Sequence, residues 1–157
     1  MTDRQRSTNL FRPFTPGGAQ APSPMAVDKN KVSAEASKLV QKGQFDKAIR
    51  AYEKILTADP GDVRVLLKIG ELQQKKGDVR AAAGTFGRVA DAYGQQGFFL
   101  KAVAVYKQVL KIAPDEVRVN ERLAALYQQL GLLSEAMGQL QAIATSAEQA
   151  GDDEKLV

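Results

Sequence analysis

The sequence predicts an all-α fold, a solenoid of antiparallel helical hairpins, and two observations lead to this prediction. Apolar residues recur at helical spacing from about Val27 onward, and no stretch shows the strict alternation of a half-buried strand. In addition, residues 44–60 (QFDKAIRAYEKILTADP) are similar to residues 98–114 (FFLKAVAVYKQVLKIAP). The two segments align without a gap at a separation of 54 positions. A chain of 157 residues with 44% hydrophobic residues can bury a core around such a repeat.

Four glycines mark the expected ends of helices. Gly43, Gly77, Gly97 and Gly131 each follow a helical run, and their spacings are 34, 20 and 34 positions. Glycine is the residue that most readily ends a helix in a left-handed turn. The separation of 54 positions between the two similar segments is therefore the sum of one spacing of 34 and one spacing of 20 between these glycines.

The spacing of 34 positions and the side-chain pattern around it resemble the tetratricopeptide repeat, a helical hairpin with a period of about 34 residues whose second helix carries A-x3-F and a later proline. The second-helix pattern occurs as Ala48-x3-Tyr52 with Pro60, Ala102-x3-Tyr106 with Pro114, Ala82-x3-Phe86 and Ala136-x3-Leu140. The first-helix pattern occurs at residues 66–70, 86–93 and 123–127 and is weakest in the first repeat, at residues 32–39. The resemblance covers residues 29–151 and implies a right-handed solenoid of about seven helices.

Residues 79–96 carry both helix patterns at once. Ala82, Phe86 and Val89 fit the second helix of one repeat, while Phe86, Val89 and Tyr93 fit the first helix of the next. At 100° per residue these side chains form one continuous stripe. We therefore expect one helix to be shared between adjacent repeats, so that the recurring unit is three helices. The alternative is a deletion that breaks the stack with a loop in the middle of this segment.

The two ends of the chain differ from the repeats between them. Residues 1–27 hold four of the six prolines, a composition that predicts a disordered tail before a repeat domain at 28–157. The apolar residues of that tail, Leu10, Phe11 and Phe14, are either a docking motif or part of a linker.

At the other end, residues 133–150 align with the shared helix at 79–96, and Gly151 is the equivalent of Gly97. Asp152 to Val157 would then open another helix that stops early. We expect an unfinished C-terminal edge. Either the repeat array is truncated there, or a partner or a second copy of the chain covers the edge.

Composition argues against most kinds of active site. The chain has no Cys and no His, which removes disulfides, thiol nucleophiles, and the commonest general base and metal ligand. The carboxylates at 59 and 62, 115 and 116, and 152–154 are expected to cap helix starts, and no phosphate-binding loop occurs. We predict no enzymatic activity, no cofactor and no metal site. The chain also has no apolar stretch of about 18 residues, so we expect no membrane insertion and a cytoplasmic location.

The net charge of +4 is weak evidence for an acidic partner. The 22 basic and 18 acidic residues are interspersed, without the run of like charges that is typical of a nucleic-acid-binding arm. Binding to nucleic acid therefore stays a minor alternative, which requires a steep fall of affinity with salt.

The resemblance implies a non-enzymatic protein-interaction scaffold or adapter, in which the first helices of the repeats line a concave groove for a peptide or helix of a partner protein. No small-molecule substrate is implied. Carried onto this sequence, the groove residues are Arg64, Leu67, Glu71, Gln74, Lys75, Asp91, Gln95, Arg118, Glu121 and Gln128, with Asn30, Ser33, Ser37, Ala125 and Gln129 completing the surface. For Arg64 and Arg118 the alternative is a solvated surface without a partner. For the whole protein the alternative is a chaperone of a secreted or membrane-targeted client.

Three glycines of the shared helix need a separate explanation. Gly84, Gly87 and Gly94 lie on one side of it together with Asp91, and each costs about 1 kcal/mol of helix stability relative to alanine. One explanation is close packing or a bend of the shared helix. The other is a bare strip against which the backbone of a partner lies.

Overall fold

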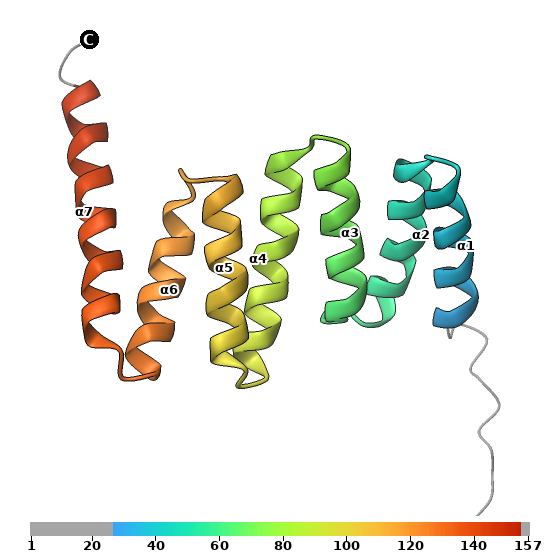
Figure 1. Ribbon diagram of the computed structural model, residues 1–157, viewed down its shortest axis with the longest axis horizontal. Coiled ribbons are helices and arrows are strands. Elements are labelled where there is room, and N and C mark those ends of the chain that lie inside the picture. The colour runs from blue at the N-terminus through green and yellow to red at the C-terminus, as the bar shows by residue number, and fades with distance from the viewer. Residues whose placement is uncertain (1–26, 155–157) are drawn as a thin grey trace, which may run out of the picture.

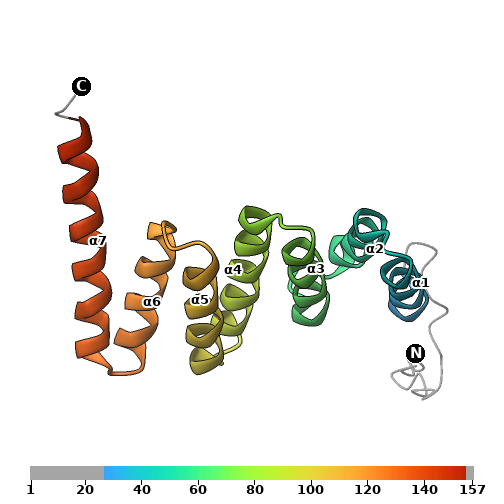
Figure 2. The ribbon, with the colours of Figure 1, turned by 45° about the horizontal axis from the view of Figure 1, so that its top comes forward.

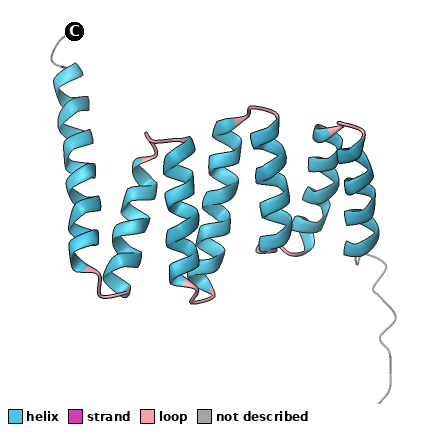
Figure 3. Ribbon diagram, in the orientation of Figure 1, coloured by secondary structure: helices cyan, strands magenta, loops and turns pink. Residues whose placement is uncertain are grey.

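Seven helices and no strand make up residues 27–154, the part of the chain that the computed structural model describes (Figures 1 and 3). They are α1 (Lys29–Gln41), α2 (Phe45–Ala58), α3 (Val63–Lys75), α4 (Val79–Gln95), α5 (Phe99–Ile112), α6 (Val117–Gln129) and α7 (Leu133–Glu154). Each helix packs against the next in an antiparallel row, so the predicted all-α solenoid of about seven helices is confirmed. Of the predicted tail, residues 1–26 lie outside the described residues.

The row of helices twists along its length. Figure 2 shows α1 and α2 close to end-on while α7 stands upright in the same view, so helix direction rotates from one end of the solenoid to the other. None of the helices described here is both long and apolar enough to cross a membrane.

The four predicted glycine turns are confirmed. Gly43, Gly77, Gly97 and Gly131 have φ values of 69°, 80°, 80° and 72°. After each one, the next backbone N–H returns to a carbonyl five residues earlier, as in the bond of 2.8 Å from Phe98 N to the oxygen of residue 93. This pattern satisfies carbonyls that a helix end leaves without partners. The turns close the pairs α1–α2, α3–α4, α4–α5 and α6–α7.

Helix α4 is shared between two repeats, as the sequence predicts. It is continuous from Val79 to Gln95, so the alternative of a loop within it is wrong. Ala82, Phe86 and Ala90 belong to a buried cluster with α5 and α6, whereas Val89 belongs to a second cluster formed with α1, α2 and α3. The helix thus joins the two parts of the core and packs extensively on both α3 and α5.

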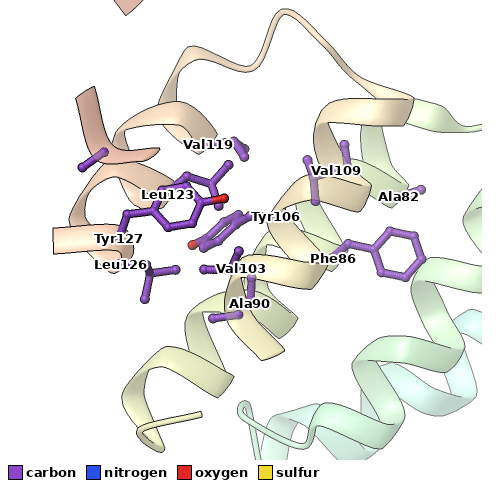
Figure 4. Packing of buried hydrophobic residues seen from close by; sticks show 13 residues of the cluster. Ala82, Phe86, Ala90, Val103, Tyr106, Val109, Val119, Leu123, Leu126 and Tyr127 are labelled. Atoms are coloured by element: carbon purple, nitrogen blue, oxygen red, sulfur yellow. The ribbon is translucent and has the colours of Figure 1, made fainter. Parts of the chain in front are cut away.

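A glycine on α3 makes room for an aromatic ring of α4. Phe86 is 2% exposed, and Figure 4 shows its ring pointing toward α3, away from Tyr106 and Leu123. A Cβ atom placed on Gly70 would lie 2.7 Å from Cε1 of Phe86, which is closer than carbon atoms can approach. The absence of a side chain at Gly70 therefore allows α3 and α4 to pack at this distance.

Two of the six joints are looser than the others. α2 packs less extensively on α3, and α5 less extensively on α6, than the helices joined by glycine turns pack on each other. These joints are the segments 59–62 and 113–116, which contain Pro60 and Pro114. A proline disfavours helix at the residue before it, so Asp59 and Ala113 are extended, and a short turn at each proline leads to the next helix.

The C-terminal helix differs from the prediction. α7 continues through Gly151 to Glu154, so the expected helix end at Gly151 and the expected new helix from Asp152 are wrong, and residues 155–157 lie outside the described part. At Gly97 the chain leaves its helix with a φ of 80°, and Phe98 packs edge-on against Tyr93 with ring centroids 6.3 Å apart. A glycine inside a helix costs only about 1 kcal/mol, so Gly151 does not by itself end α7.

The predicted capping carboxylates are confirmed in part. Asp62 caps α3, its Oδ1 accepting the N–H of Val65 at 3.2 Å. Asp59 lies at the end of α2 and not at a helix start, and it pairs with Lys29 Nζ at 2.8 Å because that ammonium reaches across from α1. Glu116 precedes α6 but its side chain makes no capping hydrogen bond. The carboxylates at 152–154 end α7, so they cap no helix start.

Candidate partner-binding site

A groove runs between α4 and α6, and α5 forms its floor. Two cavities, of about 460 and 310 Å³, open along it. Asp91 of α4, Tyr106 of α5 and Arg122 of α6 line both cavities, so the cavities adjoin at these three side chains. We name the larger cavity the neutral end of the groove and the smaller one the arginine end.

The three shared side chains form a fixed polar centre. The hydroxyl of Tyr106 donates to Oδ1 of Asp91 at 2.6 Å, and Nε of Arg122 lies 3.8 Å from the same oxygen. Burial raises the pKa of the Tyr106 hydroxyl, and the hydrogen bond to Asp91 raises it further. Tyr106 therefore stays protonated and acts as a donor at neutral pH. The centre therefore holds the Asp91 carboxylate in place through the Tyr106 hydroxyl.

The neutral end combines apolar and amide groups. Beyond the polar centre its lining is Ala90, Gly94, Gln95, Phe99, Ala125, Leu126 and Gln129. The charged side chains of this lining, Asp91 and Arg122, carry opposite charges. Amide side chains both donate and accept hydrogen bonds, so this end can contact an apolar side chain and a peptide backbone together.

The arginine end carries most of the charge. Arg80 and Arg88 line it from α4, and Arg118 and Arg122 line it from α6. The carboxylates of Asp91 and Glu116 line the same cavity, so its lining has a formal excess of two positive charges. The remaining lining residues are small or uncharged, namely Ala83, Gly84, Gly87, Tyr106, Val109 and Val119.

The groove contains only part of the predicted binding surface. Asp91, Gln95 and Arg118 line it, as do Ala125 and Gln129 of the wider set. Leu67 is partly buried between the two core clusters. The other predicted binding residues lie outside these two cavities, on α3 or on α6, namely Arg64, Glu71, Gln74, Lys75, Glu121 and Gln128. Asn30, Ser33 and Ser37 of the wider set lie on α1, also outside the cavities.

Sequence reasoning misses several lining residues, among them Tyr106 and three arginines. The sequence predicts Tyr106 only as a packing residue, because its ring is the large member of the A-x3-F pattern and nothing in the pattern reports on its hydroxyl. The pattern does not select Arg80 and Arg88 on α4, or Arg122 on α6. A signal does exist, since Arg118 and Arg122 are four residues apart and residues at that spacing share one face of a helix.

The glycines of α4 are not explained by close packing. A Cβ atom at Gly84 or Gly87 would have no neighbour within 4 Å, and one at Gly94 would lie at an ordinary 3.9 Å from Leu126. All three positions would therefore accommodate alanine without displacing another helix, in contrast to Gly70 on α3.

The family model of the tetratricopeptide repeat matches residues 39–98 and 94–153. The chain belongs to the tetratricopeptide repeat family. Its two matches begin at residues 39 and 94, a separation close to that of the internal repeat. Members of this family are typically non-enzymatic, and this solenoid is a scaffold for protein–protein interaction.

Several solved structures are similar to this chain. A crystal structure of MamA is 25% identical, with 74% of this chain and 96% of that chain covered and a TM-score of 0.38. MamA MSR-1 is 19% identical, with 82% of each chain covered and a TM-score of 0.44. MamA from Desulfovibrio magneticus RS-1 is 13% identical, with 78% and 77% covered and a TM-score of 0.44. These likenesses are too distant to support a functional statement. No protein with a curated description matches the sequence.

Proposed function

We propose that this scaffold binds a peptide or helix of a partner protein in the groove between α4 and α6. The observation that supports the proposal is the continuity of the groove, because its two cavities adjoin at Asp91, Tyr106 and Arg122 and together follow the length of α4 and α6. The polar centre stands midway along it, where it can orient a chain that lies across both ends.

The shape of the groove favours a polypeptide over a small molecule. Small-molecule sites usually enclose most of their ligand. Here the rims carry Gln95 and Gln129 at one end, and Arg80 and Arg118 at the other, none of which is buried. An open groove with apolar contacts in its floor and hydrogen-bonding groups on its rims matches the way a peptide or helix is held between helices.

The chaperone alternative depends on another part of the molecule. On α7 the side chains of Leu133 and Met137 are 65% and 70% exposed, and apolar surface of this kind can hold an unfolded client or a second copy of the chain. A Met137→Glu variant separates the alternatives. If the protein is a chaperone, the variant loses the ability to suppress aggregation of a denatured client while peptide binding in the groove is unchanged.

The proposal that the groove binds a peptide is tested by replacing a small lining residue with a large one. Short random peptides displayed on phage are selected on the full chain, and their dissociation constants are measured for the native protein, for Ala125→Phe and for Ala104→Phe. Ala125 lines the neutral end on α6, whereas Ala104 is also an exposed alanine, on α5 outside both cavities. We expect Ala125→Phe to weaken binding about tenfold or more, or ~1.4 kcal/mol, and Ala104→Phe to have no effect. Equal binding to all three proteins would show that the peptides use another surface.

A further inference from the structure

We propose that the arginine end of the groove receives an acidic segment of the partner protein, while the neutral end holds an apolar side chain of the same segment. This inference rests on the proposed function and adds to it the chemistry of the partner and its direction in the groove.

The arginines form two rows that face each other across α5. Arg80 and Arg88 lie eight residues apart on α4, which puts them within about 80° of each other around the helix, and Arg118 and Arg122 lie four apart on α6. All four side chains line one cavity of about 310 Å³. A ligand between the two helices therefore meets guanidinium groups on both sides.

Most of this positive charge is not neutralised within the protein. Among the described residues, Arg80 and Arg118 form no ion pair, and Arg88 donates only to the carbonyl oxygen of Pro60, at 3.3 Å. Arg122 approaches Asp91, but at 3.8 Å, and that carboxylate already accepts the Tyr106 hydroxyl. A guanidinium group has five donors arranged to bind a carboxylate in two places. These donors remain available to carboxylates of a partner.

The difference between the two ends gives the ligand a direction. The arginine end adjoins the first turns of α4 and α6, where Arg80 and Arg118 lie, and the neutral end adjoins their last turns, with Gln95 and Gln129. At the neutral end, Phe99 and Leu126 provide apolar contacts and the net charge of the lining is zero. A segment with acidic residues on one side of an apolar anchor is complementary to both ends.

The floor of the arginine end leaves space for the backbone of such a segment. Gly84 and Gly87 line this cavity, and a Cβ atom on either would meet no other atom within 4 Å. The arginine rows are the basis of the proposal, and the glycines only allow a chain to come close enough to both rows.

The lining favours an acidic polypeptide over a nucleic acid. Asp91 and Glu116 face the same space as the arginines, and two carboxylates among four arginines oppose a phosphate backbone, which carries charge at every nucleotide. Tyr106, the aromatic side chain of this cavity, is only 3% exposed, so it offers no face on which a base can stack. A peptide can instead place its few carboxylates beside the unpaired arginines.

The experiment uses the peptides selected on the full chain from the random display library. Their dissociation constants are measured for the native protein, for Arg80→Gln/Arg118→Gln, and for Arg50→Gln/Lys54→Gln as a matched control. The control also removes two positive charges, but from exposed positions on α2 outside both cavities. We expect peptides rich in Asp and Glu next to an apolar residue, binding about tenfold weaker to the first variant, with little change in the control and a fall of affinity with salt.

The outcomes separate this inference from the proposed function. Peptides that Ala125→Phe blocks, but that lack acidic residues and bind Arg80→Gln/Arg118→Gln as tightly as native protein, would leave the groove proposal standing and overturn the acidic partner. Peptides that Ala125→Phe does not block would overturn both. A random-sequence DNA duplex that binds as tightly as the selected peptides, and loses affinity in the same arginine variant, would replace the acidic polypeptide by nucleic acid.

Discussion

The α3–α4 hairpin and the α6–α7 hairpin occupy the same place in two successive three-helix units, yet only the first is enclosed. Phe86 of α4 is 2% exposed, whereas Leu140, its equivalent in α7, is 48% exposed. α4 packs extensively on a helix at each side, while α7 packs extensively on α6 alone among the described helices. The apolar stripe is present in both helices. The stripe becomes buried only where a second helix packs against it, as α3 and α5 both do on α4.

The largest expected difference between the hairpins is the cost of deleting their central apolar side chain. Phe86→Ala should lower the free energy of unfolding by about 3–5 kcal/mol, because it empties a buried site between α3 and α4. Leu140→Ala should cost less than about 1 kcal/mol, since half of that side chain is already in water. Denaturant unfolding of both variants measures the difference. Equal costs would mean that α7 is covered in solution by another surface, such as a second copy of the chain.

The next effect comes from the residue opposite the central side chain. Position 70 is glycine beside Phe86, and the equivalent position in the second hairpin is Ala124, paired by the same shift with the smaller Leu140. Gly70→Ala should cost about 1–3 kcal/mol through overpacking. Combining it with Phe86→Leu converts the first pair into the second, so the cost of the double variant should be clearly below the sum of the two single costs. Strict additivity in this double-mutant cycle would show that the close contact between position 70 and the Phe86 ring relaxes without strain.

The starts of the two hairpins differ in capping. Asp62→Ala should cost about 1 kcal/mol at pH 7, because it leaves the N–H of Val65 without its cap, while the equivalent Glu116→Ala should cost almost nothing. Partial burial acts to raise the pKa of Asp62, but the hydrogen bonds from Lys29 and from Val65 N–H outweigh it, so the pKa is lowered overall.

Because the pKa of Asp62 is lower in the folded protein, its contribution to stability is complete above the unfolded value of about 3.8 and is lost as the pH falls below that value. Unfolding curves of the native protein and Asp62→Ala should therefore converge in acid. A difference that stays constant from pH 7 to pH 2 would contradict a role for the ionised carboxylate.

The smallest expected effect is one that the two hairpins share. Gly84 of α4 and its equivalent Gly138 of α7 both have open space where a Cβ atom would lie. Changing either to alanine should raise stability by up to about 1 kcal/mol, because the gain is local to the helix backbone and does not depend on neighbours. Thermal unfolding of the two single variants tests this equality. A loss of stability in Gly84→Ala alone would show that α4 requires a bend at that position.

The parts of the fold that depend on a few consecutive residues can be predicted from the sequence. The turns at Gly43 and Gly97 follow from a glycine at the end of a helical run, and the sharing of α4 follows from two overlapping stripes on one helix. The end of α7 cannot be predicted in this way. Gly151 has the same sequence relation to its helix as Gly97, but the helix continues through it, because a glycine inside a helix costs only about 1 kcal/mol and does not by itself end a helix.

The groove is harder to predict because its residues come from three helices with different roles. The family pattern directs attention to first helices, and it therefore selects Asp91 and Arg118, which line the groove. It also selects Arg64 and Lys75, which α3 presents outside the two cavities. The pattern assigns Tyr106 to packing alone, since the sequence does not show that its hydroxyl meets Asp91 across 15 positions of the chain.

The looser joint at Pro114 bears on the width of the groove. α4 packs extensively on both α3 and α5, whereas α6 packs less extensively on α5 across residues 113–116. Sparse packing between elements favours local opening. The rim carrying Arg80 lies before this joint and the rim carrying Arg118 lies after it, so we expect any change in the packing of α6 on α5 to widen or narrow the arginine end.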